Sequence, residues 1–243
     1  MKLKAVAKKS SSIDRKIVAI GGGLLRIGET LPIDRYIVAW SGKERPIILF
    51  IPTASDDLPA YISTFKHIYE NLGCKVHVLR LLRHGRKDNM RATKKLILTA
   101  DIIYIGGGDY DLLTAEWKRA RIIPLIKSAY KRGALIAGLS AGCAILYEHL
   151  VDSDGKNRRL KRGIGILKGV VLPHYDGIAV LSQAFLPSIQ KKNISITAIE
   201  DNCGALYANE ALLGTIVVGN ARAFTINPPY DKKRLVHPYQ KIT

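Results

Sequence analysis

Ser140 is the residue best placed for covalent chemistry, within Gly138-Leu139-Ser140-Ala141-Gly142. The apolar run 134–137 before it is typical of a buried parallel strand, and we expect a helix to follow. A serine at such a corner is the nucleophile-elbow pattern, in which a strained turn pushes the hydroxyl out of the sheet. The amide of Ala141 would then lie at a helix N-terminus, where partial positive charge can stabilise an oxyanion.

A serine hydroxyl needs a base, and the base needs an orienting acid. Among the six histidines, His174 is the best base, because it follows an expected strand end and is held by Pro173. The next strand end supplies Glu200 and Asp201, and either could orient His174. The chain order would be Ser, His, acid. An α/β-hydrolase has the order Ser, acid, His and would need His237 as its base.

A second oxyanion donor could come from the glycine-rich segment Gly106-Gly107-Gly108-Asp109, where glycine lets a substrate approach the backbone closely. The run Gly21-Gly22-Gly23 is a weaker candidate for a dinucleotide loop, because Arg26 stands where the third glycine of that motif belongs. Cys143 would lie one helical turn inward from Ser140, and we expect it in the core.

These residues must be positioned by alternating strands and helices, which predict a three-layer α/β/α sandwich with a mostly parallel sheet. Active groups gather at the carboxyl ends of such strands, and Gly106 to Asp109, Ser140, His174 and Glu200 with Asp201 all fall there. Strands are expected at 16–20, 46–51, 75–81, 101–105, 134–137, 169–172 and 194–199. Helices are expected at 32–40, 56–72, 89–99, 110–131 with an interruption near Pro124, and 177–190. Antiparallel edge strands are expected at 204–207, 212–218 and 221–226, a loop at 152–162, and an irregular tail from 228.

Composition limits the classes of protein to consider. The 243 residues, 47% of them hydrophobic, suffice for one sizeable core, and no apolar run is long enough to span a membrane. We expect a basic tail at 1–15 and a single domain at 16–243. The three cysteines form no zinc or disulfide pattern, so a reducing cytoplasm is the expected location. We expect neither a metal nor another cofactor.

The net charge of +18 could indicate nucleic-acid binding. No aromatic residues interleave with the basic clusters and no nucleic-acid-binding motif accompanies them, so we expect a solvated surface that can steer an anionic substrate. A non-catalytic basic binding protein is the alternative to an enzyme. A homodimer is left open.

Five segments in register resemble the serine peptidase family of dipeptidase E (aspartyl dipeptidase) and cyanophycinase, which has the class I glutamine amidotransferase fold. They are Ile20 to Gly23, Ile51 to Ser55, Ile105 to Asp109, Gly138 to Gly142, and Gly165 through Gly169 to Pro173-His174-Tyr175-Asp176. The resemblance spans roughly residues 16 to 220.

The resemblance implies Ser140 as nucleophile, His174 as base, and the amides of Gly108 and Ala141 as the oxyanion hole. An ungapped match places the acid on Asp201, and a shift of one residue would place it on Glu200. Asp109 and Tyr110 are expected near the substrate, although members often carry another residue at position 110. The implied substrate is a small peptide with an N-terminal aspartate, whose carboxylate needs a cation; Arg158, Arg159 and Arg162 are candidates, with Arg159 our choice.

Overall fold

The computed structural model describes residues 14–82, 89–153, 158–175, 189, 193–230 and 233–242. Most of the expected basic tail, Asp176 and nearly all of the expected helix at 177–190 lie outside these residues. The side chains of residues 152, 153, 158, 159, 233 and 238–242 are also outside the description.

The main sheet has eight strands in the order β14-β11-β10-β1-β5-β4-β2-β3. The five strands from β1 to β3 are mutually parallel, and β10 and β11 continue the sheet in antiparallel pairs. The strands are β1 (Lys16–Ile20), β2 (Ile47–Ile51), β3 (Lys75–Val78), β4 (Ile102–Ile105), β5 (Leu135–Leu139), β10 (Cys203–Ala208), β11 (Ala211–Val218) and β14 (Pro238–Ile242). Strands buried on both faces are mainly apolar, as β4, β5 and the buried residues 17–20 of β1 are.

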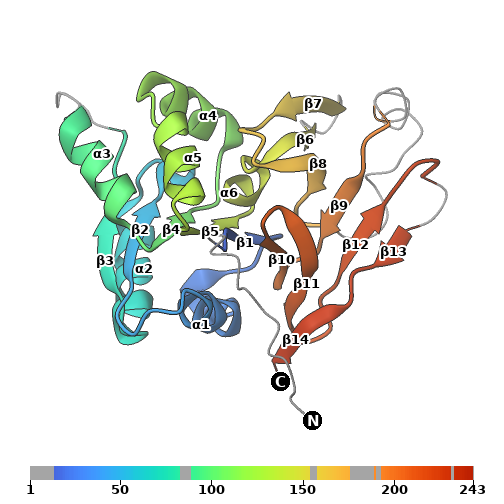
Figure 1. Ribbon diagram of the computed structural model, residues 1–243, viewed down its shortest axis with the longest axis horizontal. Helices are drawn as coiled ribbons and strands as arrows, with labels where there is room; N and C mark the ends of the chain where they lie inside the picture. Colours follow the sequence, from blue (N-terminus) through green and yellow to red (C-terminus); the bar gives the residue numbers. More distant parts are fainter. Residues whose placement is uncertain are drawn as a thin grey trace, which may run out of the picture.

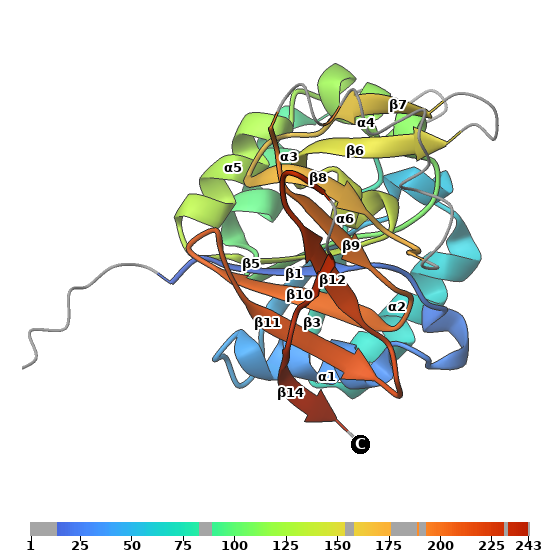
Figure 2. The same cartoon turned by 90° about the vertical axis from the view of Figure 1, so that its right-hand side faces the viewer.

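Helices cover both faces of the main sheet (Figures 1 and 2). In β1, Val18 and Ile20 pack toward α1 and α2, whereas Ile17 and Ala19 pack toward α3, α4 and α5. This alternation is why β1 is apolar from Ile17 to Ile20, the four residues that are buried. The helices are α1 (Leu31–Trp40), α2 (Pro59–Asn71), α3 (Met90–Thr99), α4 (Tyr110–Arg119) and α5 (Ile123–Lys131). The predicted three-layer α/β/α arrangement with antiparallel strands near the C-terminus is confirmed.

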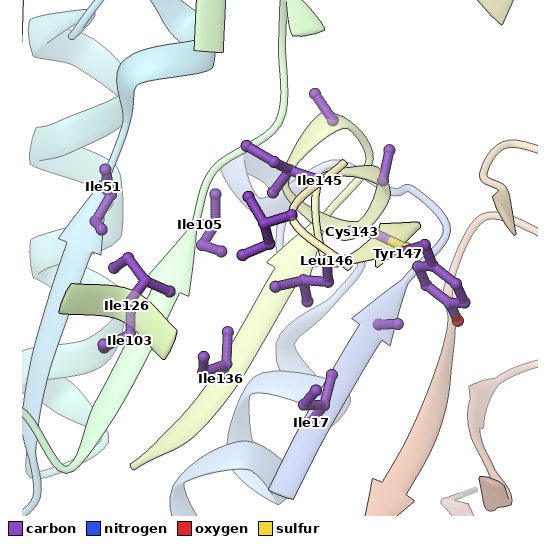
Figure 3. Close-up of a cluster of buried hydrophobic side chains, with 14 of the residues drawn as sticks. Ile17, Ile51, Ile103, Ile105, Ile126, Ile136, Cys143, Ile145, Leu146 and Tyr147 are labelled. Atoms are coloured by element: carbon purple, nitrogen blue, oxygen red, sulfur yellow. The ribbon is translucent and has the colours of Figure 1, made fainter. Parts of the chain in front are cut away.

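A second sheet of six strands, in the order β13-β12-β9-β8-β6-β7, packs beside the main sheet (Figure 1). Its strands are β6 (Tyr147–Ser153), β7 (Arg158–Arg162), β8 (Leu167–Leu172), β9 (Ile196–Ile199), β12 (Ala223–Ile226) and β13 (Lys233–Leu235). The two sheets meet where the hydroxyl groups of Tyr147 on β6 and Tyr207 on β10 hydrogen bond over 2.7 Å. A buried apolar cluster that includes Tyr147 extends from the main sheet to this contact (Figure 3).

This second sheet corrects three predictions. The segment 152–162 is not a loop, because β6 and β7 form an antiparallel pair. β7 is an edge strand of this sheet, and basic side chains are common on edge strands because they discourage pairing with other chains. The segment 221–226 joins β9 rather than the main sheet. The chain after 228 is not irregular, since it forms β13 and β14.

Two helix predictions also change at their ends. The helix expected from residue 56 begins at Pro59, because the 3₁₀ turn η2 (Thr53–Ser55) is followed by Asp56 and Asp57 with positive φ. The helix expected after Gly142 is only α6 (Ala141–Ala144). The interruption near Pro124 is confirmed, since this proline lies in the first turn of α5.

In the part of the chain that the structure describes, we find no helix with the length and apolar character that crossing a membrane requires.

Candidate active site

Ser140 lies on a strained turn between β5 and α6. Its φ of 53° and ψ of −113° fall in a region that non-glycine residues rarely adopt. The turn is closed by a hydrogen bond from its amide to the carbonyl of Ile20, over 3.0 Å. A Cβ on Gly138 would overlap the carbonyl of Gly142, and one on Gly142 would overlap that of Ile105. The two glycines are therefore required by close backbone packing.

Three side chains from separate strand ends meet at this turn. Ser140 Oγ lies 2.6 Å from His174 Nε2, and His174 Nδ1 lies 2.6 Å from Asp201 Oδ1. His174 follows β8, and Asp201 stands between β9 and β10. The His174 and Asp201 side chains are about half exposed, 51% and 56% respectively. The arrangement can pass a proton from the serine hydroxyl to an imidazole whose tautomer is fixed by the carboxylate.

Glu200, the other candidate acid, points elsewhere. Its carboxylate accepts a hydrogen bond from the amide of Arg222 over 2.8 Å and pairs with the Arg222 guanidinium at 3.0 Å. Of the two adjacent acids, it is Asp201 that contacts His174.

The loop after β1 holds the backbone of all three segments. The carbonyl of Ile20 accepts from the amide of Ser140, that of Gly21 from His174 over 3.2 Å, and that of Gly22 from Asn202 over 3.0 Å. The glycine run that could have been a dinucleotide loop is thus the backbone support of the site. A Cβ on Gly22 would overlap both the His174 ring and the Asp201 carboxylate, so glycine is required there.

Two backbone amides lie in the segments expected to form an oxyanion hole. Gly108 has a φ of +136°, and a Cβ there would overlap the carbonyl of Ala54. Ala141 is the first residue of α6. Among the described residues, neither amide donates to a backbone carbonyl. Their assignment to an oxyanion hole therefore stays a prediction.

A cavity of about 350 Å³ opens beside Ser140 and His174. Its lining comes from the loop after β1, the loop and helix after β2, and the ends of β4 and β5. The lining residues are Gly22, Gly23, Leu24, Leu25, Arg26, Ser55, Leu58, Ala60, Tyr61, Thr64, Gly107, Leu139, Ser140 and His174. Sequence reasoning missed Arg26, Leu58 and Tyr61. Arg26 lies in the segment between β1 and α1, Leu58 is the residue before α2 and Tyr61 lies in its first turn. None of them directly follows a strand, and leucine and tyrosine carry no chemical signal of their own.

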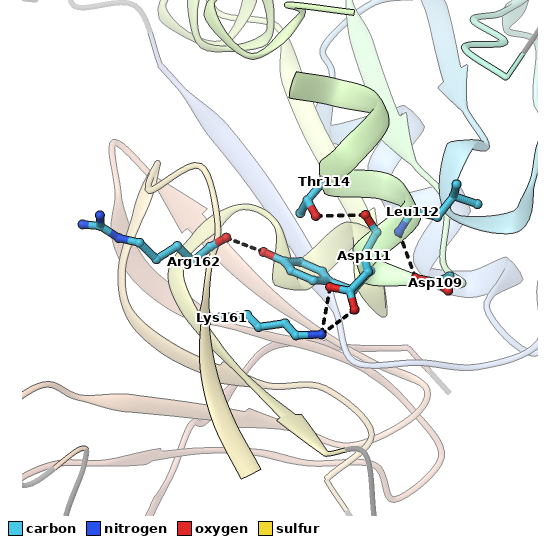
Figure 4. Close-up of polar contacts among 7 residues, drawn as sticks. Asp109, Asp111, Leu112, Thr114, Lys161 and Arg162 are labelled. Atoms are coloured by element: carbon cyan, nitrogen blue, oxygen red, sulfur yellow. Dashed lines mark hydrogen bonds and ion pairs between the residues drawn. The ribbon is translucent and has the colours of Figure 1, made fainter. Parts of the chain in front are cut away.

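The residues expected to bind substrate have other contacts (Figure 4). The Asp109 carboxylate caps α4 by accepting from the Leu112 amide over 2.9 Å. The Tyr110 hydroxyl donates to the carbonyl of Arg162 over 2.8 Å and so ties α4 to β7. Neither side chain lines the cavity beside Ser140.

Of the three arginines expected to supply a cation, the structure describes the side chain of Arg162 alone. The Arg162 guanidinium is exposed and points away from α4 (Figure 4). The side chains of Arg158 and Arg159 lie outside the described part of the structure, although both residues belong to β7. Among the described residues that line the cavity, Arg26 is the one arginine, lysine, aspartate or glutamate.

Tyr61 presents a buried hydroxyl to the cavity region. Its burial raises the pKa of the phenol, and the nearby amide of Gly107 opposes that rise. The hydroxyl oxygen makes no hydrogen bond of ordinary geometry to any described residue.

Cys143, the other nucleophilic side chain near the turn, is fully buried in the apolar cluster (Figure 3). Desolvation raises the pKa of its thiol well above the usual range, which disfavours the reactive thiolate. Nor do the described His, Cys, Asp and Glu side chains form a group of three or more that could hold a metal ion.

Comparison with known proteins gives the family. The family model described as Peptidase family S51 matches residues 17–213, most of the chain. The chain belongs to peptidase family S51. This S51 peptidase is 33% identical over 205 residues to the Bacillus subtilis protein named uncharacterized peptidase YgaJ, covering 83% of this chain and 87% of that protein. It is 24% identical over 229 residues to the cyanophycinase of Synechococcus elongatus, covering 88% of this chain and 68% of the relative.

Solved structures share the fold of this S51 peptidase. A peptidase from an acI-B1 Actinobacterium superposes with a TM-score of 0.74 at 18% identity, covering 94% of this chain and 97% of that one. A putative peptidase E protein from Listeria monocytogenes EGD-e superposes with a TM-score of 0.62 at 19% identity, covering 85% of this chain and 100% of that one. The predicted family and the predicted hydrolase class are therefore confirmed.

Proposed function

We propose that this S51 peptidase hydrolyses small peptides through an acyl-enzyme on Ser140, with His174 as general base and Asp201 as the acid that orients it. The observation that carries the proposal is the continuous chain of two 2.6 Å contacts from Ser140 Oγ through the His174 ring to Asp201 Oδ1. Glu200 has no part in it, because Arg222 occupies its carboxylate.

The reaction follows from these contacts. Ser140 Oγ attacks the scissile carbonyl carbon and gives its proton to His174 Nε2. The amides of Gly108 and Ala141 stabilise the negative oxygen of the tetrahedral intermediate. His174 then protonates the leaving amine, and the C–N bond breaks. A water molecule, deprotonated by His174, releases the acyl group as a carboxylic acid and restores the serine.

The small cavity supports a short substrate. Its volume of about 350 Å³ lies at the lower end of the roughly 300–1,000 Å³ typical of ligand pockets. The expected preference for an N-terminal aspartate rested on a cation from β7, and the described part of β7 does not supply one at this cavity. We therefore do not include that preference in the proposal.

The α/β-hydrolase alternative would use His237 as the base. His237 lines a separate hollow with Leu212, Leu213 and Leu235 and is not among the residues around Ser140. This placement favours His174.

Labelling with a fluorophosphonate probe tests the proposal directly. The wild type should label, and Ser140→Ala should not. Ser128→Ala, which changes an exposed serine on α5, is the matched control and should label like the wild type. A Ser140→Ala variant that still labels, or a wild type that neither labels nor cleaves any dipeptide, would overturn the assignment.

A further inference from the structure

The wall of the cavity beside Ser140 is mainly apolar. Leu24, Leu25, Leu58, Ala60 and Leu139 all line it, as does the ring of Tyr61. That ring is held edge-on by Phe50, with centroids 5.1 Å apart, so the apolar wall is backed by the core of the main sheet. Such a surface binds a ligand by removing apolar area from water.

Large apolar side chains are exposed at the mouth of this cavity. Leu24 is 52% exposed and Leu58 is 51% exposed, and both line it. Ile27, in the adjacent 3₁₀ turn η1 (Leu25–Ile27), is 61% exposed. Of the six exposed large apolar side chains in the described part of the chain, these three gather at one place. Exposed apolar side chains that gather beside a cavity are typical of a binding surface.

Polar groups on the wall are few. The Ser55 hydroxyl already donates to the carbonyl of Pro52 over 2.8 Å. Arg26 is exposed, so its charge is screened by water and a pair with it would contribute little. A substrate carboxylate placed against the leucines would lose its hydration and would meet no buried cation, since the remaining polar side chains on the wall outside the proposed triad, Tyr61 and Thr64, offer only neutral hydroxyls. The cavity therefore disfavours aspartate and favours a side chain without charge.

We propose that this cavity binds an apolar side chain, of about leucine to phenylalanine size, on the residue next to the scissile bond. Leu24 and Leu58 are the residues that determine this specificity. The inference rests on the proposed function and adds to it the class of substrate.

The first test measures kcat/KM on matched dipeptides in which leucine, phenylalanine or aspartate occupies each position in turn. At one of the two positions, the kcat/KM of the leucine or phenylalanine dipeptide should exceed that of the aspartate dipeptide by at least about tenfold. Apolar pockets commonly give an effect of this size. A preference for aspartate at both positions, or no preference at either, would overturn the inference while leaving the serine mechanism intact.

Binding to Ser140→Ala separates the two proposals. Calorimetric titration of this variant with the same intact dipeptides reads the preference of the cavity without the chemical step. Suppose that the wild type neither labels with the fluorophosphonate nor cleaves any dipeptide, yet Ser140→Ala binds the leucine dipeptide at least about tenfold more tightly than its aspartate counterpart. The mechanism then fails and the apolar cavity stands. Equal affinities would overturn the cavity assignment.

Leu58→Arg places a cation at the mouth and should invert the preference. Cleavage of the leucine dipeptide should fall about tenfold or more, and that of the aspartate dipeptide should rise. Leu213→Arg is the matched control, because Leu213 is an exposed leucine (43%) on β11 outside this cavity. This variant should keep the wild-type preference for leucine over aspartate dipeptides. Fluorophosphonate labelling of Leu58→Arg reports that the fold and Ser140 are intact. If the variant labels and its preference is unchanged, the assignment of Leu58 is wrong.

Discussion

The carbonyl of Gly21 accepts a hydrogen bond from the amide of His174 over 3.2 Å. Ile20 and Gly22, on either side, hold Ser140 and Asn202 in the same way. One tripeptide at the end of β1 thus fixes the backbone at or beside all three residues of the proposed triad. These contacts use backbone atoms only. The side chains of the tripeptide matter mainly because large ones at Gly21 and Gly22 would not fit.

Gly22→Ala should therefore abolish most of the activity. The added Cβ would overlap the His174 ring and the Asp201 carboxylate, and displacing catalytic groups by about 1 Å costs on the order of 100-fold in rate. We expect kcat/KM to fall at least that far. Gly42→Ala is the control. Gly42 has a φ of +71°, which is also unfavourable for alanine, but an added Cβ there would meet no other atom. It should lower stability without changing the rate; equal rates for both variants would contradict the role of Gly22.

Asp201→Asn and Glu200→Gln should differ sharply. Removing the charge that orients His174 should lower kcat by about 10³–10⁴-fold, because the ring then loses the partner that fixes its tautomer. Glu200→Gln only weakens a partly exposed ion pair with Arg222, so its rate should stay within a few-fold of the wild type. The measurement is kcat at saturating peptide. The reverse order of effects would assign the acid to Glu200.

Ser140 stores backbone strain that a glycine would release. At φ 53° and ψ −113°, Ser140→Gly should be more stable than Ser140→Ala by about 1 kcal/mol, since alanine keeps the unfavourable conformation. Urea unfolding of the two inactive variants measures this difference. Equal midpoints would mean that the turn relaxes when the hydroxyl is removed.

Asp34 should make stability depend on pH. It is fully buried on α1, where it accepts hydrogen bonds from Thr30 and Tyr69 over 2.9 and 2.7 Å, and burial raises its pKa from 3.8 to about 7. Between these two values the folded chain keeps a proton that the unfolded chain has lost. The contribution of Asp34 to stability therefore falls as pH rises from about 4 to 7, and is constant above that.

Comparison with Asp34→Asn isolates this effect. From pH 4.5 to 7.5, the free energy of unfolding of the wild type should fall by roughly 3 kcal/mol relative to the variant, at about 1.4 kcal/mol per pH unit below the folded pKa. The measurement is urea unfolding of both proteins at each pH. Parallel pH profiles would show that Asp34 is already ionised in the folded chain at low pH.

The sequence was sufficient for the parts of the molecule that depend on local patterns. The apolar runs 17–20, 102–105 and 135–139 are buried strands, and the helix predicted at 89–99 is α3, with Asn89 as its cap rather than its first residue. Ser140 and His174 could be found because each directly follows an apolar strand, although the two strands, β5 and β8, belong to different sheets and not to the single parallel sheet that the sequence predicted. The choice between Glu200 and Asp201 could not, because adjacent carboxylates differ only in the direction they face, and Arg222 determines that direction.

The second sheet and the cavity were missed for a different reason. The strand Ala223–Ile226 has the composition of an edge strand, and nothing local specifies that it pairs with β9 rather than β11. Leu58 and Leu24 resemble ordinary core residues in the sequence, and their exposure arises only when η1 and α2 are placed on either side of Ser140. Pairing partners and exposure are long-range properties, which a pattern of residue types does not contain.

Ser140 extends from a strand of the main sheet, whereas His174 extends from a strand of the second sheet. The 2.6 Å contact between them can form only when the two sheets have docked. Under the proposed mechanism, turnover therefore reports that both sheets are assembled. Because β8 follows all five parallel strands of the core in the chain, the nucleophile is synthesised before its proposed base.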